Sequence, residues 1–167
     1  MSNDTSVQLA TIISKYENEL LEGWFAGMMS RMIRRDKSAE SELRQQGAAF
    51  LQVLGDALAS GASSDIETPA WNETRRMLTE ISQARVRQGF SSIETAHFIF
   101  ALKEPLFAYL RTELKADPAA LIDAMSTTGA LFDHLGLYTI EVYQKAREQI
   151  ILRQQQELLE LSTPVVQ

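Results

Sequence analysis

The sequence predicts an all-α fold, and three observations support this prediction. Apolar residues recur at helical spacing over most of the 167 residues. Prolines and glycines stand where helices would begin and end, for example at Pro69, Gly89 and Pro118. No stretch before Val165 has the pattern of a strand. The expected architecture is a helical bundle that finishes in a long C-terminal helix.

The composition is that of an ordinary globular domain, with 45% hydrophobic and 23% charged residues. A net charge of -6 argues against nucleic-acid binding, which needs a basic surface. The absence of cysteine excludes disulfides, thiol catalysis and cysteine-ligated metals. No apolar run approaches the roughly 18 residues of a membrane span, and the N-terminus lacks a signal-peptide pattern. A cytoplasmic protein without a nucleic-acid or membrane partner is expected.

Two helical segments occupy the first part of the chain. Residues 5–35 carry apolar side chains at helical spacing, among them Trp24 and Met28. A bend at residues 15–19 is compatible with this pattern, although nothing in the sequence forces it. The second segment, residues 39–60, stops at a glycine.

Two further helices follow a short loop at residues 61–67. Thr68 and Pro69 favour a helix start, because threonine caps and proline tolerates the first turn. This helix is expected to end at Gly89. The next begins with Ser91-Ser92-Ile93-Glu94, which has the pattern of a capping box. Its apolar continuation is typical of a central helix.

The last helix is expected to run from about Ala119 to Leu161. At 1.5 Å per residue it would be about 60 Å long, more than the width of a domain of this size, so its far end must project. A regular two-stranded coiled coil would need apolar residues at three positions that hold Lys145, Gln149 and Gln156. A relay helix with weak packing and an ordinary solvated connector explain this pattern equally well.

The end of the chain predicts a change of structure. Ser162-Thr163-Pro164 breaks the helix, and Val165-Val166 favours a strand. We therefore expect a helical module that precedes a C-terminal domain beginning with a β-strand.

The sequence offers no converging set of catalytic groups. His97 and His134 lie in different predicted helices, without a second ligand at helical spacing. Glu94 precedes His97 by three residues, a spacing more typical of a local hydrogen bond than of a catalytic dyad. No phosphate-binding loop is present. The chain is therefore not expected to be an enzyme or to bind a metal. His134 is expected to be a buried core residue, with a haem ligand or a pH switch as the alternatives.

Three stretches resemble the N-terminal sensor domain of RsbR-type stressosome proteins. They are Asn18-Glu19-Leu20-Leu21-Glu22-x-Trp24, then Ala84-Arg85-Val86-Arg87-Gln88-Gly89-Phe90-Ser91, and finally Leu158-Leu159-Glu160-Leu161-Ser162-Thr163-Pro164-Val165-Val166. The third resembles the family's junction with a C-terminal STAS domain and is the most specific. Together they span nearly the whole chain.

This resemblance implies a globin-like helical bundle that usually lacks haem and forms a homodimer through helices beside the exit helix. Such domains project from a cytoplasmic assembly of STAS-domain proteins of the RsbR and RsbS type, which holds an RsbT-like switch kinase until stress. Residues 1–150 would then be the globin-like sensor domain. Residues 151–167 would be the linker helix and the first residues of a missing STAS domain. The expected function is a stress-signalling sensor or scaffold that acts through its exit helix.

The resemblance also bears on cofactors. Haem-binding sensor globins carry a His-x-Arg-x-Gly-apolar pattern, and the matching stretch here begins with Arg85, which stays protonated and cannot ligate iron. No cofactor is therefore expected. A haem-based gas or redox sensor remains the alternative, with His97 and His134 as axial candidates. A helical protein-interaction adaptor is a further alternative.

Seven residues are candidates for a dimer face or for the relay, although core burial would explain the apolar ones equally well. They are Trp24, Met28, Leu135, Tyr138, Val142, Gln149 and Gln156.

Overall fold

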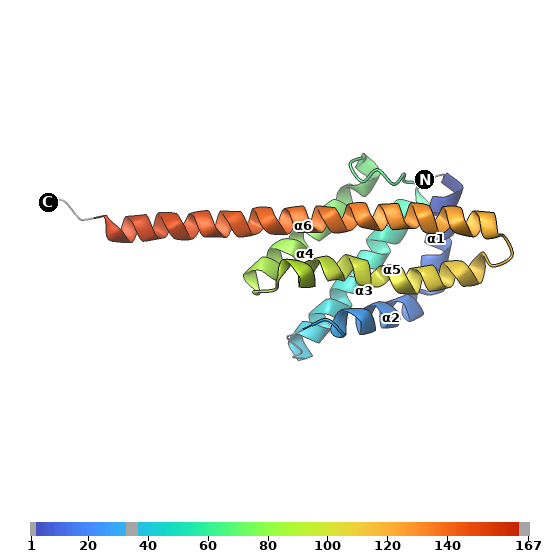
Figure 1. The fold of residues 1–167 in the computed structure, drawn as a ribbon, viewed down its shortest axis with the longest axis horizontal. Helices are drawn as coiled ribbons and strands as arrows, with labels where there is room; N and C mark the ends of the chain where they lie inside the picture. Colours follow the sequence, from blue (N-terminus) through green and yellow to red (C-terminus); the bar gives the residue numbers. More distant parts are fainter. Residues whose placement is uncertain (1–2, 33–36, 164–167) are drawn as a thin grey trace.

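The computed structural model describes residues 3–32 and 37–163, and all regular elements within these ranges are helical. They are α1 (Asn3–Lys15), α2 (Glu17–Met29), α3 (Lys37–Ala59), the short 3-10 helix η1 (Pro69–Trp71), α4 (Asn72–Arg87), α5 (Ser92–Glu113) and α6 (Pro118–Ser162). The predicted all-α bundle with a long C-terminal helix is confirmed (Figure 1). The predicted strand at Val165 and Val166 lies outside the described residues.

The local helix signals have mixed outcomes. The capping box is confirmed, because the Ser91 hydroxyl accepts a hydrogen bond from the Glu94 amide and the Glu94 carboxylate accepts one from the Ser91 amide, both at 3.1 Å. Thr68 begins η1 with an extended backbone but does not cap it, since its hydroxyl donates to the carbonyl of Asp65 at 3.0 Å.

The bend between α1 and α2 is fixed by contacts with α5. The ring of Tyr16 stacks on that of Tyr109, with 4.1 Å between the ring centroids. Its hydroxyl donates to the carboxylate of Glu113, which also accepts a hydrogen bond from Lys15 at 2.8 Å. Tertiary contacts thus separate α1 from α2 at a point where the sequence alone forces no break.

The pKa of Glu113 makes this bend sensitive to acid. The hydrogen bonds from Lys15 and Tyr16 lower the pKa of its carboxyl below the ordinary value of 4.5. The contact therefore stabilises the fold above pH 4.5, and this stabilisation is lost as pH falls through the lowered pKa. From acid to neutral pH, where tyrosine hydroxyls stay protonated, we expect the ring NMR shifts of Tyr16 and Tyr109 to change only below pH 4.5. In the Glu113→Gln variant we expect them to be altered slightly and to stay flat over the same range. A transition in the native protein centred above pH 4.5 would contradict this assignment.

The centre of the bundle is a cluster of three aromatic rings from α2, α3 and α5. The Trp24 ring lies 4.9 Å from that of Phe98 and 5.8 Å from that of Phe50, measured between centroids. The indole N–H donates to the carbonyl of Phe98 at 2.6 Å. α5 packs against α1, α2 and α6, which confirms its predicted central place.

α6 has two parts. Its first part packs against α5 and α4 and contributes buried side chains from Ala124 to Tyr143. Residues 151–163 are all exposed, and in Figure 1 this end extends well beyond the other helices. The predicted projection is therefore confirmed. Within the described ranges, no helix is both long and apolar enough to cross a membrane.

Candidate functional site

The root of the projecting helix is tied to α4 and to the α4–α5 turn by two tyrosines. Tyr143, the last fully buried residue of α6, donates from its hydroxyl to the carbonyl of Phe90 at 2.6 Å. Tyr138 and Thr79 of α4 share a hydrogen bond of 2.8 Å between their hydroxyls. These contacts fix the place at which α6 leaves the body, so a movement of the turn would move the root of the helix.

The α4–α5 turn is itself closely defined. Gly89 has a φ of +81°, a left-handed conformation that favours glycine. The amide of Phe90 donates to the carbonyl of Arg85 at 3.0 Å, and Ser91 begins the capping box of α5. This turn lies in the second stretch of family resemblance, and its structure gives a physical reason for the glycine.

Arg85 is a buried cation beside this turn. Its side chain is 3% exposed, and its guanidinium lies 4.7 Å from the centroid of the Phe90 ring. It donates one hydrogen bond, of 2.5 Å, to the amide oxygen of Gln46. Burial lowers the pKa of this guanidinium, while the charges of Glu42 and Glu94 act in the opposite direction. Sequence reasoning treated Arg85 only as a residue that cannot bind iron, and did not foresee its burial.

His97 lies beside a cavity that is too small for haem. His97 donates from Nε2 to the carbonyl of Gly27, 3.1 Å away. The cavity that it shares with Arg85 has a volume of about 20 Å³, whereas cofactor pockets have about 300–1,000 Å³. The cavity is therefore too small for a porphyrin, and the positively charged side chain of Arg85 is part of its wall.

His134 departs from its predicted place. It was expected to be buried, but its side chain is exposed and its Nδ1 hydrogen-bonds to the carbonyl of Ser64 at 2.9 Å. It borders an open depression together with Asp65 and Glu67. The reason is its position at the edge of the buried stripe of α6, facing the loop before η1.

Three of the seven candidate dimer or relay residues belong to the core of the single chain. Trp24 and Leu135 are fully buried, and Met28 is 4% exposed. A partner would not contact these side chains without opening the bundle. They hold the fold together, which is the alternative that the sequence left open.

The other four lie along α6. Tyr138 and Val142 are half-buried, with Tyr138 bonded to α4, whereas Gln149 and Gln156 are exposed on the projecting part. The seven residues therefore do not form one surface.

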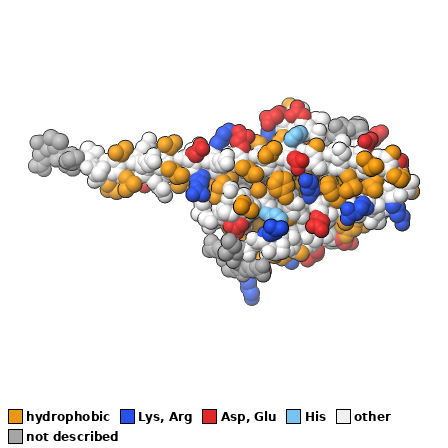
Figure 2. All heavy atoms as spheres, viewed as in Figure 1, with side chains coloured by type: hydrophobic (Ala, Val, Ile, Leu, Met, Phe, Trp, Pro, Cys, Tyr) orange, Lys and Arg blue, Asp and Glu red, His pale blue; other side chains and the backbone are white. Residues whose placement is uncertain are grey.

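An exposed apolar surface instead covers the outer side of α5 and α6. We call it the α5–α6 face and define it by Ile93, Phe100, Phe107, Ile122, Leu137 and Ile140. Ile93 is 78% exposed, Ile122 69% and Leu137 62%. Figure 2 shows hydrophobic side chains gathered over these two helices. Such a patch on a small domain marks an interaction surface.

Two glycines of α6 give the α5–α6 face its shape. A Cβ atom at Gly136 would lie 2.2 Å from Cζ of Phe100, and one at Gly129 would lie 3.8 Å from Cζ of Phe107. The two phenylalanine rings therefore lie directly against the α6 backbone. The equal spacing of these residues is a signal for this contact in the sequence. The two glycines are seven residues apart, and so are the two phenylalanines.

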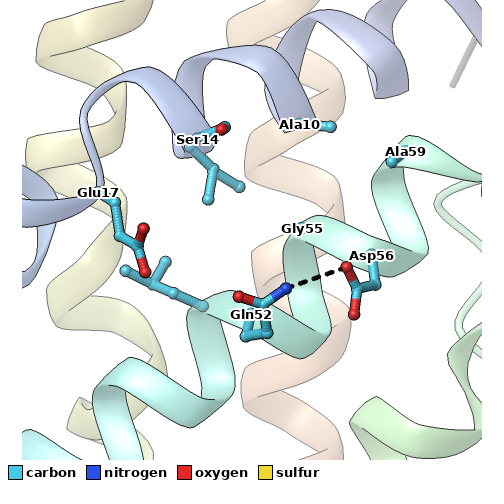
Figure 3. A pocket seen from close by; sticks show the side chains of 9 residues that line it. Ala10, Ser14, Glu17, Gln52, Gly55, Asp56 and Ala59 are labelled. Carbon is cyan, nitrogen blue, oxygen red and sulfur yellow. Dashed lines mark hydrogen bonds between the residues drawn. The ribbon is translucent and has the colours of Figure 1, made fainter.

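A separate groove of about 240 Å³ runs between α1 and α3. Figure 3 shows small side chains such as Ala10 and Ala59 along it, with the carboxylates of Glu17 and Asp56 at its rim. Gln52 donates to Asp56 at 3.2 Å. Among the described residues, no hydrogen bond joins the Ser14 hydroxyl of the lining to either carboxylate, and no group of three His, Cys, Asp or Glu side chains could hold a metal ion.

Comparison with known protein families gives a match over most of the chain. The family model described as the RsbT co-antagonist protein rsbRD N-terminal domain matches residues 18–158. This range begins in α2 and includes the root of α6, the α4–α5 turn and the α5–α6 face, whereas α1 precedes it. No curated protein and no solved structure matches the chain.

Proposed function

The chain belongs to the family of RsbT co-antagonist RsbRD N-terminal domains and is a stressosome-type sensor domain, and from this membership we propose that it is non-enzymatic and relays a signal through α6. The observation that carries the proposal is the form of α6. It is tied to the α4–α5 turn at Tyr143 and then projects with exposed side chains. The target would be a STAS domain that follows residue 163, within a cytoplasmic assembly of RsbR-type and RsbS-type proteins that controls an RsbT-like switch kinase.

The working unit in this proposal is a homodimer that pairs through the α5–α6 face. Two copies related by a two-fold axis would cover each other's exposed Ile93 and half-buried Phe100 and Ile140, and the two exit helices would leave the dimer side by side. Haem is not part of the proposal, because the cavity beside His97 does not fit it.

Two weakly apolar stripes run along the projecting part of α6. The first contains Ile151, Gln155 and Leu158 and continues the direction of the α5–α6 face. The second contains Gln149, Leu152, Gln156 and Leu159 and lies roughly a third of a turn away at 3.6 residues per turn. Each stripe is interrupted by glutamine, so neither would bind a partner helix strongly. A small rotation at the root would exchange one stripe for the other, and only a signal that favours one of the two states would drive it.

Opposite substitutions in the two stripes test this relay. Gln155→Leu should favour pairing through the first stripe, and Gln149→Leu with Gln156→Leu should favour the second. In cells carrying the full-length protein, we expect one variant to raise and the other to lower the basal stress response. Both should blunt its induction.

A matched control is Glu157→Leu, which adds a leucine on the side of the helix away from both stripes. It should leave basal and induced responses near the native level. Unchanged responses in all three variants would overturn the relay.

A further inference from the structure

The Arg85 guanidinium is buried with fewer partners than its charge requires. Its single hydrogen bond goes to a neutral amide, that of Gln46. Among the described residues, no carboxylate oxygen forms an ion pair with it within 4.0 Å. Buried charges are normally paired, because a buried ion without a partner is costly.

The two nearest sources of negative charge are engaged elsewhere. The Glu94 carboxylate accepts from the Ser91 amide in the capping box of α5. The Glu42 carboxylate accepts from the side-chain amides of Gln46 and Gln88, at 3.3 and 3.1 Å, so its charge acts on Arg85 without a direct hydrogen bond. The field of these carboxylates offsets part of the buried charge, but neither supplies an acceptor to the remaining N–H groups.

A small cavity adjoins this cation. Its volume is about 20 Å³, enough for one water molecule or one ion of similar size. Arg31, His97 and the Glu94 carboxylate also line it, and the rest of its wall is mainly apolar, including Met28, Leu43 and Phe98. Two arginines against one carboxylate give the lining a net positive charge, which favours a small anion.

We propose that this cavity binds one small monovalent anion, of the size of chloride, against the Arg85 guanidinium. The anion would accept hydrogen bonds from Arg85 N–H groups to which the described residues supply no acceptor. It would also neutralise a charge that the fold leaves incompletely paired. Phosphate, acetate and other larger anions would exceed a cavity of about 20 Å³.

Anion binding would affect the contacts at the root of the exit helix α6. The ring of Phe90 packs on Arg85, and the carbonyl of the same residue accepts the hydrogen bond from Tyr143. This consequence rests on the proposed relay, whereas anion binding itself does not. A failed relay experiment would therefore leave the binding proposal standing, and the reverse also holds.

The test measures thermal unfolding at constant ionic strength while sodium chloride replaces sodium gluconate stepwise. Both salts screen charges equally, but gluconate is too large for the cavity. A ligand that binds only the native state raises the Tm, so we expect a saturable rise with chloride. At ten times the dissociation constant the rise should be about 3–6 °C for a domain of this size.

Two variants assign the response to Arg85. Arg85→Met should abolish the chloride dependence, whatever its own Tm in gluconate. Arg87→Met removes the same charge from an exposed position two residues later on α4 and should keep the dependence. If Arg85→Met does not fold, a second measurement takes its place. The native protein is added to chloride, and the line width of the chloride-35 NMR signal is followed while bromide competes for the cavity.

Three results would overturn the proposal. The first is a native protein whose Tm does not depend on chloride, which would mean that water alone occupies the cavity. The second is an Arg85→Met variant that responds as the native protein does, which would place the chloride effect elsewhere. In the NMR measurement, the third such result is a chloride-35 signal that the protein does not broaden, or whose broadening bromide does not reverse.

Discussion

Replacing Trp24 with alanine is expected to lower the free energy of unfolding by about 3–5 kcal/mol, the range for removing a large aromatic side chain from a core. The side chain is fully buried and touches the rings of Phe50 and Phe98 from two other helices. Its N–H also donates to the carbonyl of Phe98. The loss would be a large share of the 5–15 kcal/mol that stabilises a typical domain.

The measurement is urea unfolding at several protein concentrations, because dimerisation would otherwise contribute to the apparent stability. Trp24→Phe keeps a ring in the cluster and should lose much less than Trp24→Ala. Phe25→Ala changes the next residue, which is only half-buried and lies under the guanidinium of Arg44, and should also lose little. If Trp24→Ala unfolded like the native protein but failed to dimerise, Trp24 would belong to the dimer face and not to the core.

The helices of this chain were largely predictable, because their signals are local. The capping box at Ser91 and the Asp117-Pro118 start of α6 are set by residues within one turn. The length of α6 followed from an uninterrupted helical pattern. The bend at Tyr16 was not predictable in the same way, because the contacts that fix it come from Tyr109 and Glu113, nearly a hundred residues away.

The candidate site was harder to predict, because burial depends on the rotation of each helix against its neighbours. Apolar periodicity identified Trp24 and Leu135 as important but could not separate a core contact from a dimer contact. The burial of Arg85 could not be predicted in this way, because nothing in the sequence shows that its guanidinium packs against the Phe90 ring. The paired spacing of Gly129 with Gly136 and of Phe100 with Phe107 becomes informative only when α5 and α6 are known to be antiparallel neighbours.

Ile93→Asp is expected to weaken the proposed homodimer at least about 30-fold while leaving each copy folded. The side chain is 78% exposed in the single chain, so the monomer loses almost no packing. Ile93 is also the second residue after the Ser91 cap, and an acidic side chain near a helix N-terminus is favourable. In a two-fold dimer the variant would bury two unpaired carboxylates, each costing about 1–3 kcal/mol, which together correspond to about 30-fold to 10⁴-fold in affinity.

Sedimentation equilibrium over a wide concentration range measures this effect, with circular dichroism to confirm the fold. Val7→Asp provides the control, because it introduces the same charge at an exposed apolar residue of α1, outside the α5–α6 face. If Val7→Asp dissociated the dimer and Ile93→Asp did not, pairing would involve α1 rather than the α5–α6 face. A native protein that stayed monomeric at every concentration would mean that the exposed Ile93, Ile122 and Leu137 bind a different protein, which is the adaptor function. The exit helices would then have no partner helix, and the two stripes of α6 would lose their role in the relay.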